Sequence, residues 1–248
     1  MELNDLVKGK EISYKGGSFL SIERDLKNIE DNPIKQYLLS NQEELHLDKI
    51  RKTFYKLKKI PKREMLFFDV ETCGFSYNCP IFAIGMTHLN HNIVTSCFFA
   101  RDYSEEKTVL KYFVDMLPNY HAFLTYNGLA FDLTRVDKRL IANGLRTTEE
   151  GTLKKALEMS HLDLKQELSS MRKLNLPDLK LQTVEKILFG MTRENDIPSS
   201  EIPIVYNNYM KREKETKMAN VINHVMTDTL SLPAILAYVV KESERRGR

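Results

Sequence analysis

The chain of 248 residues has no hydrophobic run that approaches the ~20 consecutive apolar residues of a transmembrane helix. Its first residues, MELNDLVKGKEISYK, contain no apolar core segment, so we expect no signal peptide. Internal repeats and low-complexity linkers are absent as well. These absences argue against a membrane protein and against a membrane partner.

Cysteine is also scarce. Cys73, Cys79 and Cys97 are odd in number and follow no metal-ligand spacing, so free thiols in a reducing cytoplasm are the simplest interpretation. Hydrophobic residues make up 42% of the chain and charged residues 29%, which is typical of a soluble globular protein. The length fits one large α/β domain, or a domain with an extension.

The formal net charge of +3 says little about partners, but its distribution says more. Residues 49–63, KIRKTFYKLKKIPKR, hold eight Lys or Arg and no acid. One interpretation is a solvated helix whose Phe54, Leu57 and Ile60 face the core. The other is a surface that contacts the phosphate backbone of a nucleic acid, since local basic charge drives non-specific binding. Both can hold together.

Apolar patterns predict a mixed sheet flanked by helices. The predicted strands are 65–70, 81–89, 93–100 and 122–127, with GSFLSIE (17–23) as a weaker addition. The short connection LNHN predicts an antiparallel hairpin between the second and third of the four. A helix then leads to the fourth, which predicts parallel pairing for that strand.

Helices are predicted from apolar spacing and from residues typical of helix ends. They span 41–60, ended by Pro61; 104–117, capped by Ser104; about 129–143, ended by Gly144; 180–188; 201–211; and 217–242. The last is expected to be broken or kinked near Pro233.

The stretch MLFFDVETCG (65–74) places two acids at the end of an apolar strand. Side chains at i and i+2 of a strand share a face, so Asp69 and Glu71 should lie close together. Two like charges at the edge of a core repel each other, and each loses hydration. The pair therefore requires a cation between the acids or an open, wet edge.

Three further stretches carry polar side chains next to apolar elements: YNGLAFD (126–132), HLDL (161–164) and NHVMTD (223–228). Asn127 and Gly128 follow a strand, and Asp132 lies one turn into the next helix. His224 and Asp228 share one helical face, because they are four residues apart.

Each of these residues also has an interpretation without chemistry. Asp132 fits an exposed acid of a first helical turn, and His224 with Asp228 fits a solvated pair. Asp163 fits a helix cap, and Asn127 fits a turn. Considered together, however, Asp69, Glu71, Asp132 and Asp228 are four carboxylates at the edges of apolar elements. Mg²⁺ and Mn²⁺ prefer oxygen ligands, and two such ions about 3.5–4 Å apart can clamp a phosphodiester.

FDVET, YNGLAFD and HVMTD resemble the three motifs of the DEDD exonuclease branch of the ribonuclease H-like superfamily. The closest likeness is to the YprB-type ribonuclease H-like domain, which is similar to the proofreading domain of family B DNA polymerases. It covers residues about 65–240 in motif order and includes the accessory stretches HLDL, LQTVEKILFG, REND-IP and DTLSL.

The resemblance implies an α/β fold with a ribonuclease H-like mixed sheet over residues 61–248. Residues 1–60 form an N-terminal extension, and it stays open whether this extension packs on the same domain. Two divalent cations, Mg²⁺ or Mn²⁺, are implied as cofactors.

The family's residue roles are implied motif by motif. The implied metal ligands are Asp69, Glu71, Asp132 and Asp228, and the implied substrate contacts are Thr72 and Asn127. His224 is implied to position or deprotonate the attacking water. HVMTD has three residues between His and Asp, which is the spacing of the branch with Tyr at this position, and the YprB-type subgroup shows this combination. Phe75 is open to two interpretations, a core residue or a stacking platform for a terminal base.

The leading prediction is a metal-dependent 3′→5′ exonuclease that hydrolyses single-stranded DNA or RNA by a two-metal mechanism. One alternative is a ribonuclease H-like module that binds nucleic acid or a helicase-like partner without cutting. The four acids argue against it, because binding alone does not need them. Another alternative is a structure-directed endonuclease. The expected partners are single-stranded nucleic acid ends and a helicase, repair or replication protein.

Overall fold

The computed structural model describes residues 3–54, 65–89, 92–146, 161–171, 174–211 and 215–246. Its strands are β1 (Lys10–Tyr14), β2 (Gly17–Asp25), β3 (Met65–Thr72), β4 (Ile81–Leu89), β5 (Ile93–Phe99), β6 (Ala122–Thr125) and β7 (His161–Asp163). Its α-helices are α1 (Leu3–Val7), α2 (Pro33–Ser40), α3 (Leu47–Thr53), α4 (Glu106–Met116), α5 (Asp132–Ala142), α7 (Leu164–Ser170), α8 (Leu181–Val184), α9 (Ile202–Met210) and α10 (Glu215–Arg245). Short 3-10 helices are η1 (Leu26–Asn28), η2 (Gln42–Leu45) and η5 (Leu117–Asn119), and η7 (Glu185–Phe189) is a π-helical turn.

The described strands form one seven-stranded sheet in the order β1-β2-β5-β4-β3-β6-β7. Neighbours from β1 to β3 in this order are antiparallel, whereas β3, β6 and β7 are parallel. The predicted hairpin is confirmed as β4 and β5. The predicted parallel pairing of the fourth strand is confirmed too, and its neighbour is β3. The sheet is therefore mixed, as the sequence indicated.

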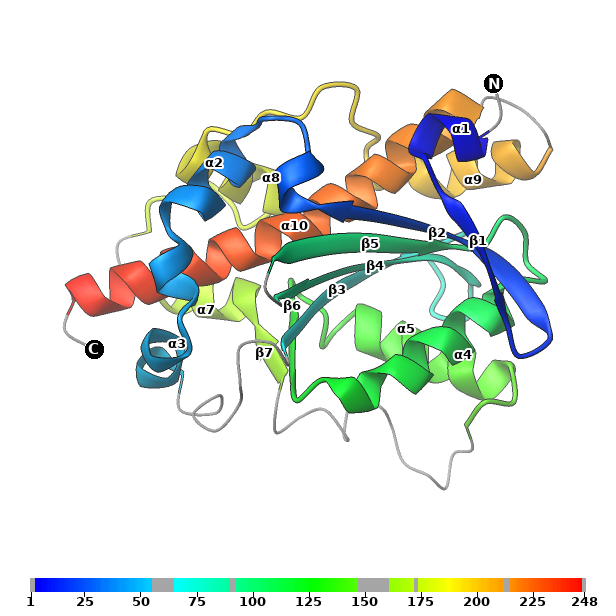
Figure 1. The fold of residues 1–248 in the computed structure, drawn as a ribbon, viewed down its shortest axis with the longest axis horizontal. Coiled ribbons are helices and arrows are strands. Elements are labelled where there is room, and N and C mark those ends of the chain that lie inside the picture. The colour runs from blue at the N-terminus through cyan, green and yellow to red at the C-terminus, as the bar shows by residue number, and fades with distance from the viewer. Residues whose placement is uncertain are drawn as a thin grey trace.

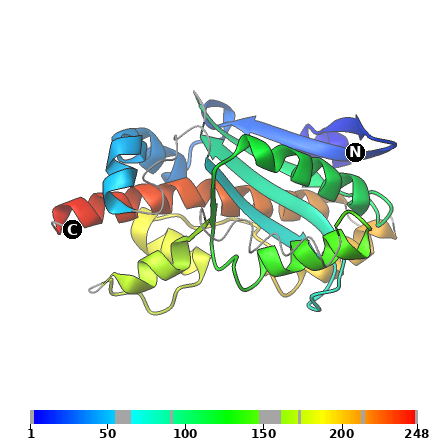
Figure 2. The ribbon, with the colours of Figure 1, turned by 90° about the horizontal axis from the view of Figure 1, so that it is seen from below.

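Helices cover both faces of this sheet. Helices α4 and α5 lie on one face, and α10 crosses the other, as Figures 1 and 2 show. Strand β3 lies inside the sheet, between β4 and β6, and its first four residues, Met65 to Phe68, are fully buried. Both faces of such a strand are buried, so its residues are continuously apolar instead of alternating between apolar and polar. This explains the sequence MLFF at residues 65–68.

Gly85 on β4 allows α10 to approach the sheet closely. A Cβ at this position would lie 2.5 Å from Cγ1 of Val225 and 3.0 Å from the Val225 carbonyl oxygen. Gly85 pairs in register with Asp69 on β3, and directly opposed residues share a face of the sheet. Helix α10 therefore passes over the face that carries Asp69.

Helix α10 is continuous over 31 residues, with Pro233 inside it. A break at Pro233 is therefore wrong, while the alternative of a kink stays a prediction. Proline removes one backbone hydrogen bond, at a cost of ~3 kcal/mol or more. The neighbouring residues Ala234, Ile235 and Leu236 are fully buried, and their packing offsets this cost.

Two other local predictions need correction. The stretch 41–60 is not one helix, because η2 and α3 are separated by His46 in an extended conformation. Ser104 is not the cap of α4: Glu105 occupies that position, and the Ser104 amide and hydroxyl both donate to Asp102. The helix end at Gly144 is confirmed, and its φ of +65° is a conformation that favours glycine.

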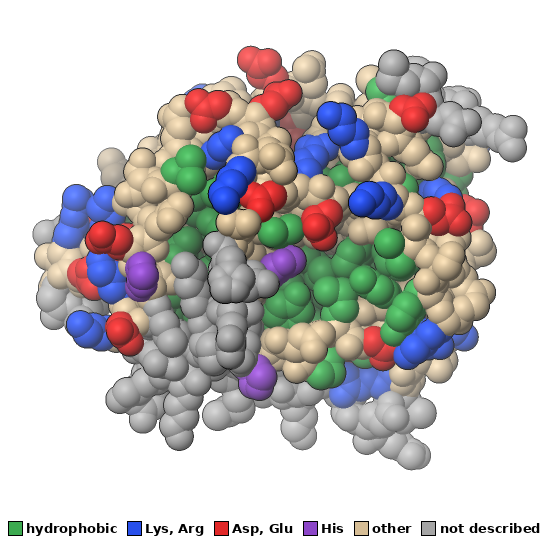
Figure 3. All heavy atoms as spheres, in the orientation of Figure 1, with side chains coloured by type: hydrophobic (Ala, Val, Ile, Leu, Met, Phe, Trp, Pro, Cys, Tyr) green, Lys and Arg blue, Asp and Glu red, His purple; other side chains and the backbone are tan. Residues whose placement is uncertain are grey.

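The N-terminal strands belong to the same sheet, because β2 pairs with β5. The division of the chain at residue 60 stays a prediction. Phe54 is buried as expected, but Lys56, Lys58 and Lys59 of the basic stretch fall outside the described residues. On the face in Figure 3, Lys and Arg side chains lie among Asp and Glu side chains. The described helices include none with the length and apolar character to cross a membrane.

Candidate functional site

The candidate site begins at the carboxyl end of β3. Asp69 and Glu71 point to the same face, as the strand period requires. The β3–β4 register shifts between Glu71 and Thr72, and such irregularities often redirect side chains next to active sites. The parallel strands β6 and β7 end at the same edge, where open α/β sheets place their sites.

The turn after β6 is held in place by the ends of two strands. Asn127 has a φ of +68°, which Asn tolerates better than most residues, and its amide donates to Asp163 at 2.9 Å. The Gly128 amide donates to the Thr125 hydroxyl at 3.1 Å. Asp163 also caps α7 by accepting from the Lys165 amide, which confirms the predicted cap. These contacts fix the chain just before α5.

Helices α5 and α10 carry the remaining predicted residues of the site: Asp132 on α5, and His224 and Asp228 on α10. Asp132 begins α5 and is buried, so the interpretation as an exposed acid is wrong. His224 is buried as well, so the solvated pair is wrong. His224 Nε2 lies 3.8 Å from Glu71 Oε1 and 3.4 Å from Asp228 Oδ2. The structure thus joins α10 to the end of β3.

A pocket of about 260 Å³ opens at this edge. Its lining includes six of the predicted residues: Asp69, Glu71, Thr72, Phe75, Asn127 and Asp132. Phe75 is 70% exposed, so the core interpretation is wrong. The Thr72 hydroxyl donates to the Gly74 carbonyl at 2.7 Å and shapes the turn that carries Phe75. Arg135 also lines the pocket and supplies a positive charge.

The acids strongly influence one another. Burial raises the pKa of Asp69 well above its usual range, and repulsion from Asp132, Asp228 and Glu71 adds to the effect. Burial raises the pKa of Glu71 to about 8, against an opposing effect of His224. Burial raises the pKa of Asp132 to about 7, against Arg135. This edge of the sheet therefore favours bound protons or other cations.

Burial alone would lower the pKa of His224, but three carboxylates outweigh it. Asp228, Asp196 and Glu71 raise the pKa of His224 to about 9. The imidazole Nδ1 lies 2.7 Å from Asp196 Oδ1. Burial raises the pKa of Asp196, but His224 and Arg193 outweigh it and lower the pKa. The ionised carboxylate can only accept, so Nδ1 donates.

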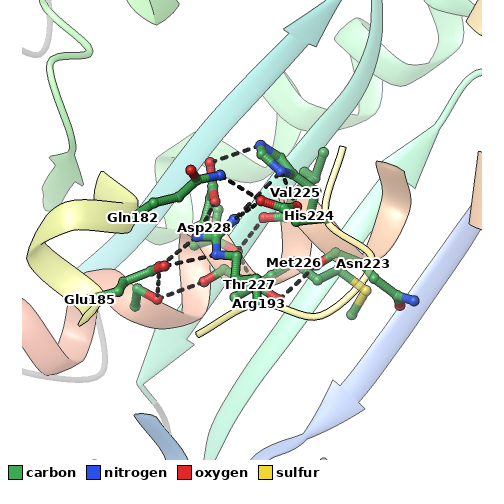
Figure 4. A network of polar contacts seen from close by, with 12 residues as sticks. Gln182, Glu185, Arg193, Asn223, His224, Val225, Met226, Thr227 and Asp228 are labelled. Carbon is green, nitrogen blue, oxygen red and sulfur yellow. Dashed lines mark hydrogen bonds and ion pairs between the residues drawn. The ribbon is translucent and has the colours of Figure 1, made fainter. Parts of the chain in front are cut away.

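Arg193 lies on the other side of Asp228 (Figure 4). Its Nη2 is 2.5 Å from Asp228 Oδ1, and its Nε and Nη2 donate to Glu185 at 2.8 and 2.5 Å. Glu185 is fully buried in the π-helical turn η7 and also accepts from Ser231 at 2.5 Å. Asp228 and the buried Glu185 therefore both contact the guanidinium of Arg193.

Within the described residues, no three His, Cys, Asp or Glu side chains are arranged to hold a metal ion as they stand. The chemistry of the donors nevertheless fits a hard divalent ion, because the acids supply only oxygen and their raised pKa values favour a neutralising cation. Asp69, Glu71 and Asp132 share the pocket, and Asp228 has one oxygen turned to Arg193. These four residues would hold the ions.

Glu185, Arg193 and Asp196 were not assigned roles from the sequence. They lie in the accessory stretches LQTVEKILFG and REND-IP, whose likeness to the subgroup is the only sequence signal for them. Their contacts join separate elements, 8 residues apart for Glu185 and Arg193 and 28 for Asp196 and His224, and local pattern does not reveal such contacts. The placement of the predicted residues agrees with their motifs, while their roles stay proposals.

Comparison with known proteins gives a consistent picture. The protein of Bacillus subtilis (strain 168) called "Uncharacterized protein YprB" is 28% identical over an alignment of 196 residues, which covers 73% of this chain and 43% of that protein. The chain thus spans less than half the length of this relative. A family B DNA polymerase from the hyperthermophilic archaeon Pyrobaculum calidifontis has a similar fold, with a TM-score of 0.57 and 17% identity over 71% of this chain and 24% of the polymerase.

The family model of the RNase_H superfamily matches residues 66–240, from the second residue of β3 to the buried part of α10. This range includes the strands, the turn and the helices that build the pocket. The mixed sheet with helices on both faces agrees with it, so the predicted ribonuclease H-like fold is confirmed. The chain therefore belongs to the RNase_H superfamily.

Proposed function

We propose that this chain is a divalent-metal-dependent nuclease that acts as a 3′→5′ exonuclease on single-stranded DNA or RNA. The observation that carries the proposal is the meeting of Asp69, Glu71, Asp132 and Asp228 at one sheet edge with His224 beside them. Such a set raises the energy of the metal-free protein, because each acid is desolvated near the others. A catalytic role would explain why the protein contains this unfavourable set of acids.

Membership of the RNase_H superfamily supports nuclease chemistry, and the order of the three motifs supports the exonuclease branch. The relative from Bacillus subtilis is described only as uncharacterized, and the polymerase supports the fold alone. The substrate, the direction of cleavage and the two-metal mechanism therefore depend on the site.

Each residue has a role that its position permits. When bound, two divalent ions would supply Lewis-acid activation of the attacking water and stabilise the leaving oxygen. Asp69, Glu71, Asp132 and Asp228 bind these ions, and His224 orients the water through Nε2. Arg135, at the pocket wall, neutralises part of the phosphate charge. Thr72 and Asn127 contact the terminal nucleotide, and Phe75 stacks on its base.

A second candidate is a module that binds nucleic acid without cutting it. The contact between Arg193 and Asp228 favours this alternative, because it occupies one of the oxygens that an ion would use. In that case the guanidinium of Arg193 would neutralise Asp228 in place of a metal ion. A cleavage assay separates the two candidates.

The test uses oligonucleotides of DNA and RNA, labelled at the 5′ end, in single- and double-stranded form. Mg²⁺ or Mn²⁺ should produce a ladder of fragments shortened from the 3′ end, and EDTA should prevent it. Asp69→Asn and Asp228→Asn should abolish the ladder, whereas Asp48→Asn, an exposed acid on α3, should not change it.

Circular single-stranded DNA provides the control for direction. An exonuclease leaves the circle intact, whereas its linearisation would favour the structure-directed endonuclease. Binding of the oligonucleotides without any cleavage, in either metal, would favour the non-cleaving module.

A further inference from the structure

We propose that Arg193 and Asp196 form a clamp that positions two residues of the site, with Arg193 fixing Asp228 and Asp196 fixing His224. These are positioning residues, because they act through Asp228 and His224. The catalytic consequence rests on the proposed function, whereas the contacts and their effect on ion binding do not.

The first arm of the clamp is the guanidinium of Arg193. Glu185 holds it by two hydrogen bonds, and Ser231 on α10 holds Glu185 by a third. Arg193 and Glu185 are both shielded from solvent, with side chains 7% and 1% exposed. The guanidinium therefore has a fixed direction, and its Nη2 forms an ion pair with Asp228 Oδ1 at 2.5 Å, although the contact lacks the geometry of a hydrogen bond.

Arg193 has acidic partners besides Glu185. Glu185 forms a bidentate pair with the guanidinium, Nη2 also reaches Asp228, and Nη1 lies 3.8 Å from Asp196 Oδ2. The contact with Asp228 selects which carboxylate oxygen faces Arg193. Asp228 Oδ2 stays on the other side, 3.4 Å from His224 Nε2. The first arm thus sets the rotation of the carboxylate.

The second arm is the carboxylate of Asp196. Its Oδ1 accepts from His224 Nδ1 at 2.7 Å, and its Oδ2 accepts from Gln182 at 2.5 Å. Both oxygens are thus engaged, so the carboxylate cannot rotate freely. A ring held at Nδ1 must direct Nε2 the opposite way, toward Glu71 and Asp228. Nε2 itself has no hydrogen-bond partner within the described residues.

One local feature lets a single segment carry both arms. Asn195 lies between them with a φ of +55°, a left-handed conformation that Asn tolerates. This residue turns the chain, and both Arg193 and Asp196 reach α10 from it. Glu194, in the same segment, is exposed and makes no ion pair with the described residues, so Glu194→Ala is a matched control.

The second arm is tested by NMR on metal-free protein with ¹⁵N-labelled histidine. We expect one Nδ1–H signal that exchanges slowly with water and is absent in His224→Asn, which assigns it. Asp196→Ala should lose this signal, Asp196→Asn should retain it with faster exchange, and Glu194→Ala should match wild type. A wild-type signal in Asp196→Ala would overturn this arm.

The first arm is tested by calorimetric titration with Mn²⁺, which does not require activity. Arg193→Lys keeps the charge but loses the planar fork, so we expect Mn²⁺ affinity to fall about 10-fold or more, within the ~10–100-fold range of residues that orient metal ligands. Equal or tighter binding in Arg193→Lys would overturn this arm, because Arg193 would then act only as a competing charge. Glu194→Ala should bind as wild type.

Turnover gives the functional readout. Asp196→Ala should lower kcat by ~10–100-fold with KM for the oligonucleotide within about twofold, and Asp196→Asn should recover part of the rate. Unchanged kcat in a cleaving wild-type background would overturn the catalytic consequence. If wild type does not cleave, the proposed function fails, while the NMR and Mn²⁺ results still decide the clamp.

Discussion

Replacing Gly85 by alanine tests how the site depends on the distance between α10 and the sheet. The new Cβ would lie 2.5 Å from Val225 Cγ1 and 3.0 Å from both Thr229 Cγ2 and the Val225 carbonyl oxygen. A side chain can rotate away, but the carbonyl oxygen belongs to the helix backbone. Helix α10 must therefore move outward by several tenths of an ångström.

The expected cost follows from this crowding. Adding a methyl group to a tightly packed core typically costs ~1–3 kcal/mol. For a chain of this size, ~1 kcal/mol corresponds to ~2–4 °C in Tm, so we expect a decrease of roughly 2–12 °C. His224 and Asp228 flank Val225 on the displaced helix and would move with it. Because this displacement is smaller than the ~1 Å that costs ~10²-fold in rate in enzymes, we expect a loss of rate below that factor.

Thermal unfolding, Mn²⁺ titration and cleavage measure the three effects on the same protein. Val225→Ala in the Gly85→Ala background removes the closest contact, so it should recover part of the Tm and part of the Mn²⁺ affinity. The reasoning is refuted if Gly85→Ala keeps both the wild-type Tm and the wild-type Mn²⁺ affinity. In that case the close approach of α10 would not be needed for the site.

Three other predictions concern charge and surface. The metal-free protein should lose stability as pH rises from about 4.5 to 9. The raised pKa of Glu71 means that its ionised form is destabilised in the folded protein, by on the order of 5 kcal/mol once ionisation is complete. The raised pKa of His224 means that only its protonated form is stabilised, and this contribution is lost as His224 deprotonates. Saturating Mn²⁺ should flatten this decline in Tm, and an increase in stability over the same range would contradict it. Phe75→Ala should weaken binding of single-stranded oligonucleotides by ~1–3 kcal/mol with unchanged Tm, whereas Leu39→Ala, another exposed apolar residue, should change neither. Charge reversal at three lysines of the basic stretch 49–63 should reduce the slope of log K against log salt, and an unchanged slope would identify that stretch as merely solvated.

Strand periodicity was sufficient to predict the start of the site. The alternation of side chains placed Asp69 and Glu71 on one face, and the structure has them there. The sheet's hairpin and its parallel strand were also predictable, because connection length limits how strands can pair. Burial was less predictable: nothing local distinguishes Asp132 in the site from an exposed acid of a first helical turn.

The contacts of Arg193 and Asp196 were beyond sequence reasoning for a physical reason. Both depend on where η7 and α10 meet in space, and their partners Glu185 and His224 are 8 and 28 residues away. The absence of a break at Pro233 was beyond sequence reasoning for a similar reason. Propensity counts the lost hydrogen bond, but burial of the neighbouring residues depends on the whole fold.

The position of α10 in the chain has a consequence for folding kinetics. This helix contacts β3, β4 and β5, and it follows them by more than a hundred residues. Contacts across such separations form slowly, because a long loop must close before they yield any stabilisation. Until α10 docks, the face of β3 that carries Asp69 and Glu71 stays open to water, and neither acid is desolvated. We therefore expect the electrostatic cost of the site to arise when α10 docks, and divalent ions in solution to speed that step.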